Sequence, residues 1–154
     1  MDLPVPKLRW FCDLDVELGP IRETGAGRAG RRRIIPIIGG RAKGDGFEGV
    51  VMNLGADWQT IFANQTADLD TRYAVETDDG AVIEIINKGY RHGAPEVVER
   101  LARGEDVPPG EYYMRTSARL ECGDPRFSWV NDMIFVGVGA RQTSVVKMTL
   151  YVVE

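Results

Sequence analysis

The sequence has few of the residues that most metal and nucleophilic sites use. Its 154 residues include one histidine, His92, and two cysteines, Cys12 and Cys122. A single histidine leaves little material for a histidine-based zinc site or a Ser-His-Asp triad. The cysteines lie far apart without CxxC spacing, and we expect them to be reduced, packed thiols. We therefore expect neither a metal nor a cofactor.

The sequence also lacks a basic excess and a long apolar run. Its formal net charge is -4, whereas nucleic-acid binding generally needs a basic face. The one basic run, Arg28 with 31–33, lies beside glycines and suggests a loop entering a strand, with a phosphate-binding patch as the alternative. No charged-then-apolar leader opens the chain, and no apolar stretch approaches the ~20 residues that span a bilayer. We expect a cytoplasmic protein without nucleic-acid or membrane partners.

Turn-forming residues are plentiful. The 18 glycines and 8 prolines suit a fold with many turns and little helix. Short β-type runs recur about every ten residues, which predicts one all-β domain over 1–154, with a sandwich as the alternative to a barrel. We favour a closed antiparallel barrel of about eight to nine strands, a size that can hold one small ligand. The expected strands are 8–18, 33–38, 47–54, 58–63, 71–77, 81–87, 112–121, 127–138 and 144–153.

Glycine and proline positions predict further local details. Only 94–103 has helical character, with Pro95 at an early position and Gly104 as a stop signal. Asp79-Gly80 predicts a hairpin turn between two alternating runs. Pro36 removes a ladder donor, so it should lie at an edge or a bulge, in a strand that 39–40 should end.

Strand alternation collects charged residues on one face of two segments. Arg115 shares a face with Arg119, and Asp70 shares a face with Arg72. One interpretation leaves these faces in water, as antiparallel sheets often do. The other turns some of them into the barrel, where burial would require pairing. An inward Asp-Arg pair could bind a carbonyl, hydroxyl or carboxylate of a substrate.

Two clusters with tryptophan supply further candidates. Asp57 precedes Trp58 and could cap a turn, accept a ligand hydrogen bond or act as a general base. Trp58 could pack or form a pocket wall. Trp129 and Asn131 lie close together in 127–132, where core packing by the aromatic residues is the alternative to a ligand contact.

Several short motifs, in order, resemble a known family. They are 33–40 (RIIPIIGG), 46–49 (GFEG), 55–58 (GADW), 70–73 (DTRY), 78–83 (DDGAVI), 87–89 (NKG), 113–115 (YMR), 127–131 (FSWVN) and 134–137 (IFVG). The chain resembles, from about residue 8 to 153, the bacterial and fungal domain of unknown function 3237, also called uncharacterised protein family 0311. Tyr113 departs mildly from the phenylalanine expected there. The resemblance implies a calycin-like barrel, similar in shape to allene oxide cyclase, and no settled activity.

The resemblance also implies a set of pocket residues by their positions in these motifs. We interpret Asp57, Asp70 and Arg115 as catalytic candidates. The substrate-binding candidates are Trp58, Arg72, Asp79, Trp129 and Asn131. For Asp79, the hairpin turn remains the preferred explanation.

Three functions fit these features. The first is cofactor-free acid-base catalysis on a small organic molecule by an isomerase, cyclase or lyase. In it, Asp57 or Asp70 moves a proton, while arginines stabilise negative charge on oxygen. The second is a carrier barrel without turnover, and the third is a structural homo-oligomer. An unpaired carboxylate in the pocket would favour the enzyme, and acids all paired with arginine would favour the carrier.

Overall fold

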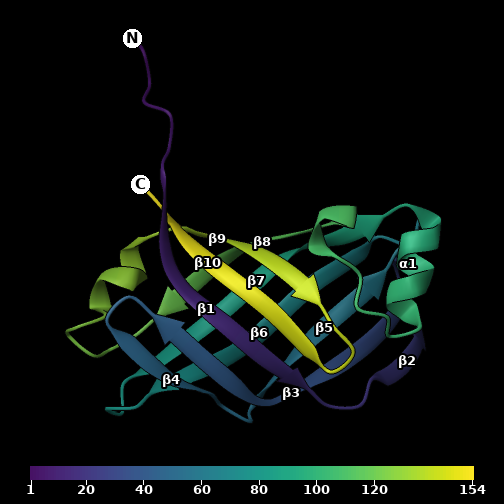
Figure 1. Ribbon diagram of the computed structural model, residues 1–154, viewed down its shortest axis with the longest axis horizontal. Coiled ribbons are helices and arrows are strands. Elements are labelled where there is room, and N and C mark those ends of the chain that lie inside the picture. The colour runs from purple at the N-terminus through teal and green to yellow at the C-terminus, as the bar shows by residue number, and fades with distance from the viewer.

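The strands close into an antiparallel barrel (Figure 1). The computed structural model describes residues 1–154. Its elements are β1 (Leu8–Leu18), β2 (Arg22–Ala26), β3 (Arg31–Gly44), β4 (Phe47–Val51), β5 (Gly55–Ile61), β6 (Ala67–Thr77), β7 (Val82–Gly93), α1 (Pro95–Ala102), η1 (Pro109–Glu111), β8 (Tyr112–Glu121), η2 (Ser128–Asp132), β9 (Phe135–Arg141) and β10 (Val145–Val153).

The barrel has eight strand positions in its ring. Neighbouring strands run β1, β10, β9, β8, β7 and β6, and β3 returns to β1. Between β6 and β3, β5 and β4 follow one another and share a single position, because β5 pairs with the first half of β3 and β4 with the second. β2 extends the sheet along β3 beyond the end of β1. The predicted closed antiparallel barrel is confirmed. Its ten strands fill eight positions, because β4 and β5 share one and β2 lies outside the ring.

Three local signals are confirmed. α1 covers Pro95–Ala102, within the predicted helix. The turn at Asp79-Gly80 joins β6 to β7, with Gly80 at a φ of 91°. Pro36 lies between Ile34, where the pairing of β3 with β2 ends, and Ile37, where its pairing with β1 begins beside a bulge. The backbone N–H that Pro36 lacks therefore costs the sheet no hydrogen bond.

Several predicted boundaries are wrong. β5 begins at Gly55 and not at 58, β6 begins at Ala67 and not at 71, and β7 runs to Gly93 and not to 87. Two further differences have a clear physical reason. β3 continues through Gly39 and Gly40 to Gly44, because the glycines allow β1 to approach closely. A Cβ at Gly40 would collide with the carbonyl of Asp15. The segment 127–138 is not one strand, since η2 occupies Ser128–Asp132 and β9 begins at Phe135. The sequence also gave no prediction of β2.

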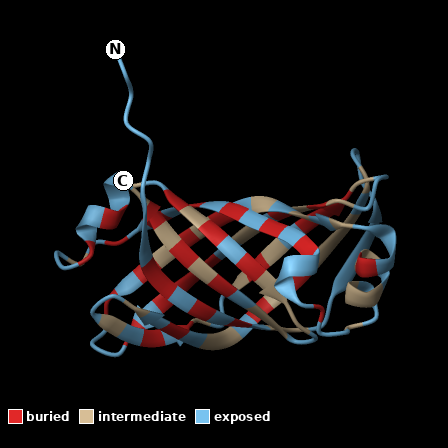
Figure 2. Ribbon diagram, turned by 45° about the horizontal axis from the view of Figure 1, so that its top comes forward, coloured by how far each residue is buried: buried red, intermediate tan, exposed pale blue.

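Buried and exposed residues alternate along the strands, producing the chequered pattern of Figure 2. Inside the barrel, the end next to η2 is filled by aromatic rings: Phe11 lies 5.1 Å from Phe135 and 5.7 Å from Phe47, measured between ring centroids. α1 lies at the opposite end of the barrel (Figure 1). None of the helices has the length and apolar character needed to cross a bilayer. Aromatic rings therefore fill the η2 end of the interior.

Candidate functional site

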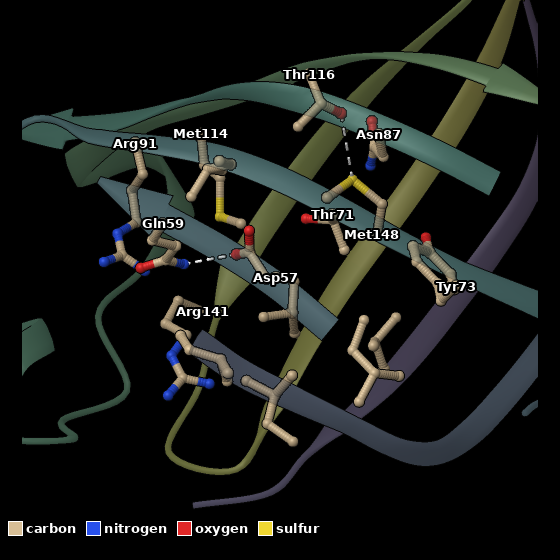
Figure 3. A pocket seen from close by; sticks show the side chains of 16 residues that line it. Asp57, Gln59, Thr71, Tyr73, Asn87, Arg91, Met114, Thr116, Arg141 and Met148 are labelled. Carbon is tan, nitrogen blue, oxygen red and sulfur yellow. Dashed lines mark hydrogen bonds between the residues drawn. The ribbon is translucent and has the colours of Figure 1, made fainter. Parts of the chain in front are cut away.

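A small cavity lies inside the barrel (Figure 3). Its volume is about 40 Å³, room for about three water molecules at ~10–15 Å³ each. Its wall is apolar for a little over half of its residues. The lining residues are Val16, Leu18, Ile35, Ile37, Asp57, Gln59, Leu69, Thr71, Tyr73, Asn87, Arg91, Met114, Thr116, Arg141, Val146 and Met148.

Asp57 is the one carboxylate in this lining. It points inward from β5, and its Oδ2 accepts a hydrogen bond from Gln59 Nε2 at 2.6 Å, while its Oδ1 accepts one from the backbone N–H of Asp70 at 3.0 Å. Burial raises the pKa of Asp57 above the ordinary 3.8, although these hydrogen bonds, one from Thr71 and the charge of Arg91 oppose the rise. Asp57 is thus held in place yet retains proton affinity.

Arginines surround this carboxylate without forming ion pairs with it. Arg91 and Arg141 line the cavity, and Arg33 lies behind Gln59, whose Oε1 accepts a hydrogen bond from Arg33 Nε at 2.9 Å. Burial, followed by the charges of Arg91 and Arg31, lowers the pKa of Arg33 to about 10.

The cavity-lining arginines are desolvated in the same way. Burial is the main cause that lowers the pKa of Arg91, with the charge of Arg141 second. Burial also lowers the pKa of Arg141, with the charge of Arg33 second. Both remain cations at neutral pH, since a guanidinium group is not deprotonated in proteins. The site therefore concentrates positive charge that the protein leaves largely uncompensated.

Strand register forms a polar row beside Asp57. Asp57 pairs with Thr71 across β5 and β6, and Thr71 pairs with Asn87 across β6 and β7. Asn87 is only 2% exposed, and its Oδ1 has no hydrogen-bond partner. In Figure 3, Arg91 and Arg141 lie at one end of the cavity and Asn87 at the other, with Asp57 between them.

The sequence-predicted residues next to Asp57 lie on the outer surface. Asp70 is exposed, with its carboxylate 3.4 Å from Lys88 Nζ. Arg72 is exposed and paired with Glu84 at 2.6 Å. Trp58 points outward and is 38% exposed. The interpretation that turned Asp70 and Arg72 inward is corrected, because the apolar residues of β6 take the inner face.

Arg115 and Asp79 also lie outside the cavity. Arg115 extends along the surface of β8, where its guanidinium lies 5.5 Å from the ring centroid of Tyr113. The inner face of β8 is taken by Met114 and Thr116. Asp79 accepts hydrogen bonds from Thr77 and Arg126 at the β6–β7 turn. Asp79 is therefore a turn residue, as the preferred interpretation of the sequence had it.

Trp129 and Asn131 belong to the closed end of the barrel. Trp129 packs edge-on against Phe11 at 5.6 Å between ring centroids, beneath the guanidinium of Arg9. Asn131 accepts a hydrogen bond from the backbone N–H of Cys122 at 2.8 Å and donates one to its carbonyl at 3.1 Å. These contacts hold η2 against the end of β8. Of the eight predicted site residues, the cavity includes Asp57 alone.

A family model described as "Protein of unknown function (DUF3237)" matches residues 6–153. This chain belongs to the DUF3237 family. Among curated relatives, the DUF3237 chain is 39% identical to the UPF0311 protein RPA1785 of Rhodopseudomonas palustris over 148 residues, which cover 96% of this chain and 97% of the relative. The resemblance found in the sequence motifs is confirmed.

Solved structures share the DUF3237 barrel. The crystal structure of the conserved protein of unknown function RPA1785 has a TM-score of 0.95, covering 99% of this chain and all of the other. A β-barrel-like protein from Acinetobacter baumannii, 40% identical, has a TM-score of 0.87 with 99% of each chain covered. An enzyme from Penicillium herquei, 18% identical, has a TM-score of 0.74 with 100% of this chain and 99% of the other covered, and that likeness concerns the fold alone.

Sequence reasoning missed the arginine and amide groups that point inward in this DUF3237 barrel. Alternation offered a usable signal, because each group continues an apolar face. Arg33 follows the parity of Ile35 and Ile37, and Asn87 follows that of Ile83 and Ile85. A polar side chain in register with buried neighbours points inward unless the strand bulges. The remaining missed groups are Gln59, Arg91 and Arg141.

Proposed function

We propose that this protein binds a small organic molecule in the barrel cavity and moves a proton on it without a cofactor, with Asp57 as the base. The observation that carries the proposal is a lone inward carboxylate, hydrogen-bonded but not ion-paired, in a cavity that also holds arginines. It favours the enzyme over a carrier, for which every acid would be tied to an arginine.

The environment of Asp57 suits general-base work. A carboxylate with an ordinary pKa is a weak base at neutral pH, and burial strengthens it by disfavouring the charged form. The hydrogen bond from Gln59 fixes the carboxylate while Arg33 fixes Gln59. The base is therefore oriented before any substrate arrives, which lowers the reorganisation needed for proton transfer.

The arginines can stabilise the anion that forms when the substrate loses a proton. When Asp57 takes a proton from a carbon next to a carbonyl, the electron pair of the C–H bond shifts to the carbonyl oxygen as an enolate. Guanidinium N–H groups of Arg91 or Arg141 would donate hydrogen bonds to that oxygen in a partly desolvated space. Return of the proton to the same or a neighbouring carbon gives exchange or isomerisation, with atoms and charge balanced.

The proposal is tested by hydrogen-deuterium exchange on carbon acids. The protein is incubated in D2O with acetone, dihydroxyacetone and 4-oxopentanoate, and loss of the C–H signals next to each carbonyl is followed by proton NMR. We expect catalysed exchange with at least one probe, abolished in Asp57→Asn. Asp70→Asn is the matched control, because Asp70 lies on the same sheet region but faces solvent, and it should retain the exchange rate.

Two results would overturn the proposal. If exchange is no faster than in buffer for all three probes, the proposed proton transfer on carbonyl compounds is wrong. Exchange that persists at full rate in folded Asp57→Asn would remove Asp57 as the base.

A further inference from the structure

The arginines around Asp57 carry more positive charge than nearby acids neutralise. Arg33, Arg91 and Arg141 all experience the charge of Asp57, and the one other acid that acts on them, Glu23 at Arg33, is already ion-paired with Arg31. All eleven ion pairs of the protein lie elsewhere and involve other side chains. Three cations with one anion leave a formal surplus of two positive charges. Desolvated cations without partners are costly to a fold, so such a surplus points to an anionic ligand.

Two cavity residues have polar atoms that nothing in the protein satisfies. They are Arg141 Nη1 and Asn87 Oδ1, and they are the only buried side-chain atoms of the chain without a hydrogen-bond partner. Buried polar atoms in native proteins are almost always paired. That both exceptions belong to one narrow cavity indicates groups prepared for a bound molecule.

From these groups we infer that the cavity takes a small carboxylate that carries a second oxygen function, with the carboxylate at Arg91 and Arg141 and the second oxygen near Asn87. The inference rests on the proposed function, since it names the substrate class of the same site. Guanidinium groups match carboxylate geometry, and an amide can turn to offer either N–H or C=O to the second oxygen.

The spacing of the groups supports this orientation. Asn87 and Arg91 lie four residues apart on β7 and share its inner face, so their Cα atoms are about 13 Å apart at ~3.3 Å per residue. Asp57 lies two strands from Asn87 in the same row. A molecule held at both ends would present its middle carbons to Asp57.

The small volume of the cavity limits the size of the ligand. Its volume of about 40 Å³ is well below the ~150 Å³ of an engineered cavity that admits benzene. A five-carbon keto acid of eight heavy atoms also exceeds this volume, so its binding requires lining side chains to move, and an unbranched chain needs less of that movement than a ring. Met114 and Met148 line the cavity, and flexible methionine side chains can adjust to such a chain.

Binding of three related probes tests the inference by isothermal titration calorimetry. The probes are 4-oxopentanoate, its uncharged methyl ester, and pentanoate, which lacks the keto group. We expect 4-oxopentanoate to bind at least tenfold more tightly than the ester and more tightly than pentanoate. Arg91→Met and Arg141→Met should each weaken its binding about tenfold or more. Arg115→Met is the matched control, because it removes an exposed arginine from the outer face of β8.

Asp57→Asn gives an independent readout that does not require an arginine variant to fold. Removing its negative charge should tighten binding of 4-oxopentanoate severalfold and leave the ester unchanged. Equal affinity for acid and ester, or an affinity that Asp57→Asn leaves unchanged, would overturn the inference.

The two proposals fail separately. Selective carboxylate binding without catalysed exchange would support the carboxylate site and remove proton transfer. Catalysed exchange on acetone that exceeds exchange on 4-oxopentanoate would support Asp57 as a base and remove the carboxylate site.

Discussion

At the scale of single residues, Asp57, the base in our proposal, carries a cost to stability. Burial raises its pKa, and the groups that face it from neighbouring strands are Arg33, Arg91, Arg141 and Tyr73. The raised pKa means that the folded protein holds a proton at Asp57 more tightly than the unfolded chain does. Ionisation of this carboxylate therefore opposes folding.

We predict that Asp57→Asn gains stability over the wild type as pH rises. Below the unfolded value of 3.8, both states are protonated and the pH-dependent difference is absent. It grows between 3.8 and the folded pKa, then stays constant, reaching about 1.4 kcal/mol for each unit by which the folded pKa exceeds 3.8. Urea unfolding from pH 3 to 8 measures it.

The control for this prediction is Asp70→Asn, on the solvent face. Its difference from the wild type should not grow with pH in the same direction. A difference that shrinks with pH for Asp57→Asn would mean that the arginines dominate and that the folded pKa of Asp57 is lowered.

At the scale of elements, β9 makes room inside the barrel. Its inward positions between Phe135 and Arg141 are Gly137 and Gly139, which have no side chain. Met114 fills the space at Gly139, and Thr116 and Met148 fill that at Gly137. The glycines thus allow larger side chains of facing strands to form the cavity wall.

We predict that Gly137→Ala destabilises the protein by about 1–3 kcal/mol, the usual cost of overpacking. A Cβ there would meet the hydroxyl of Thr116 and lie 2.9 Å from Met148 Sδ. Urea unfolding measures the change. Gly123→Ala is the control, since a Cβ at Gly123 meets nothing within 4 Å, and it should lie within about 0.5 kcal/mol of the wild type. If the two variants are equally stable, β9 shifts freely to accommodate the added methyl group and the prediction is wrong.

At the scale of the whole molecule, ring closure pairs each barrel strand on both sides. β2 is the exception, because it pairs with β3 alone and all five of its residues are exposed. An unpaired strand edge of this kind is where a second copy of the chain could add. If the protein forms the homo-oligomer that the sequence offered as one alternative, β2 is the edge at which two copies would pair.

We predict that the amide protons of β2 exchange with solvent at least tenfold faster than those of β10, which pairs with β1 and β9. Hydrogen exchange followed by NMR or mass spectrometry measures the difference. Protection of β2 equal to that of β10 at high protein concentration, lost on dilution, would instead indicate pairing between copies.

Much of the fold could be predicted because its signals are local. The helix at Pro95–Ala102 and the turn at Asp79-Gly80 need only nearby residues. The continuation of β3 through Gly39-Gly40 and the break within 127–138 could not be predicted in this way. Gly40 serves an approach by β1 from far along the chain, and η2 is held by the contact of Asn131 with Cys122.

The sequence by itself determined most of the strands, their alternation and the family, because a period of two residues and short motifs can be recognised without knowing which strands are neighbours. It also separated Asp70 and Arg72 from Thr71 and Tyr73. Only the tertiary structure decided which face of each strand lines the interior, and it gathered Asp57, Asn87 and Arg141 from three strands. Closure of the ring and the register between strands fix those positions, and both depend on contacts between residues distant in the chain.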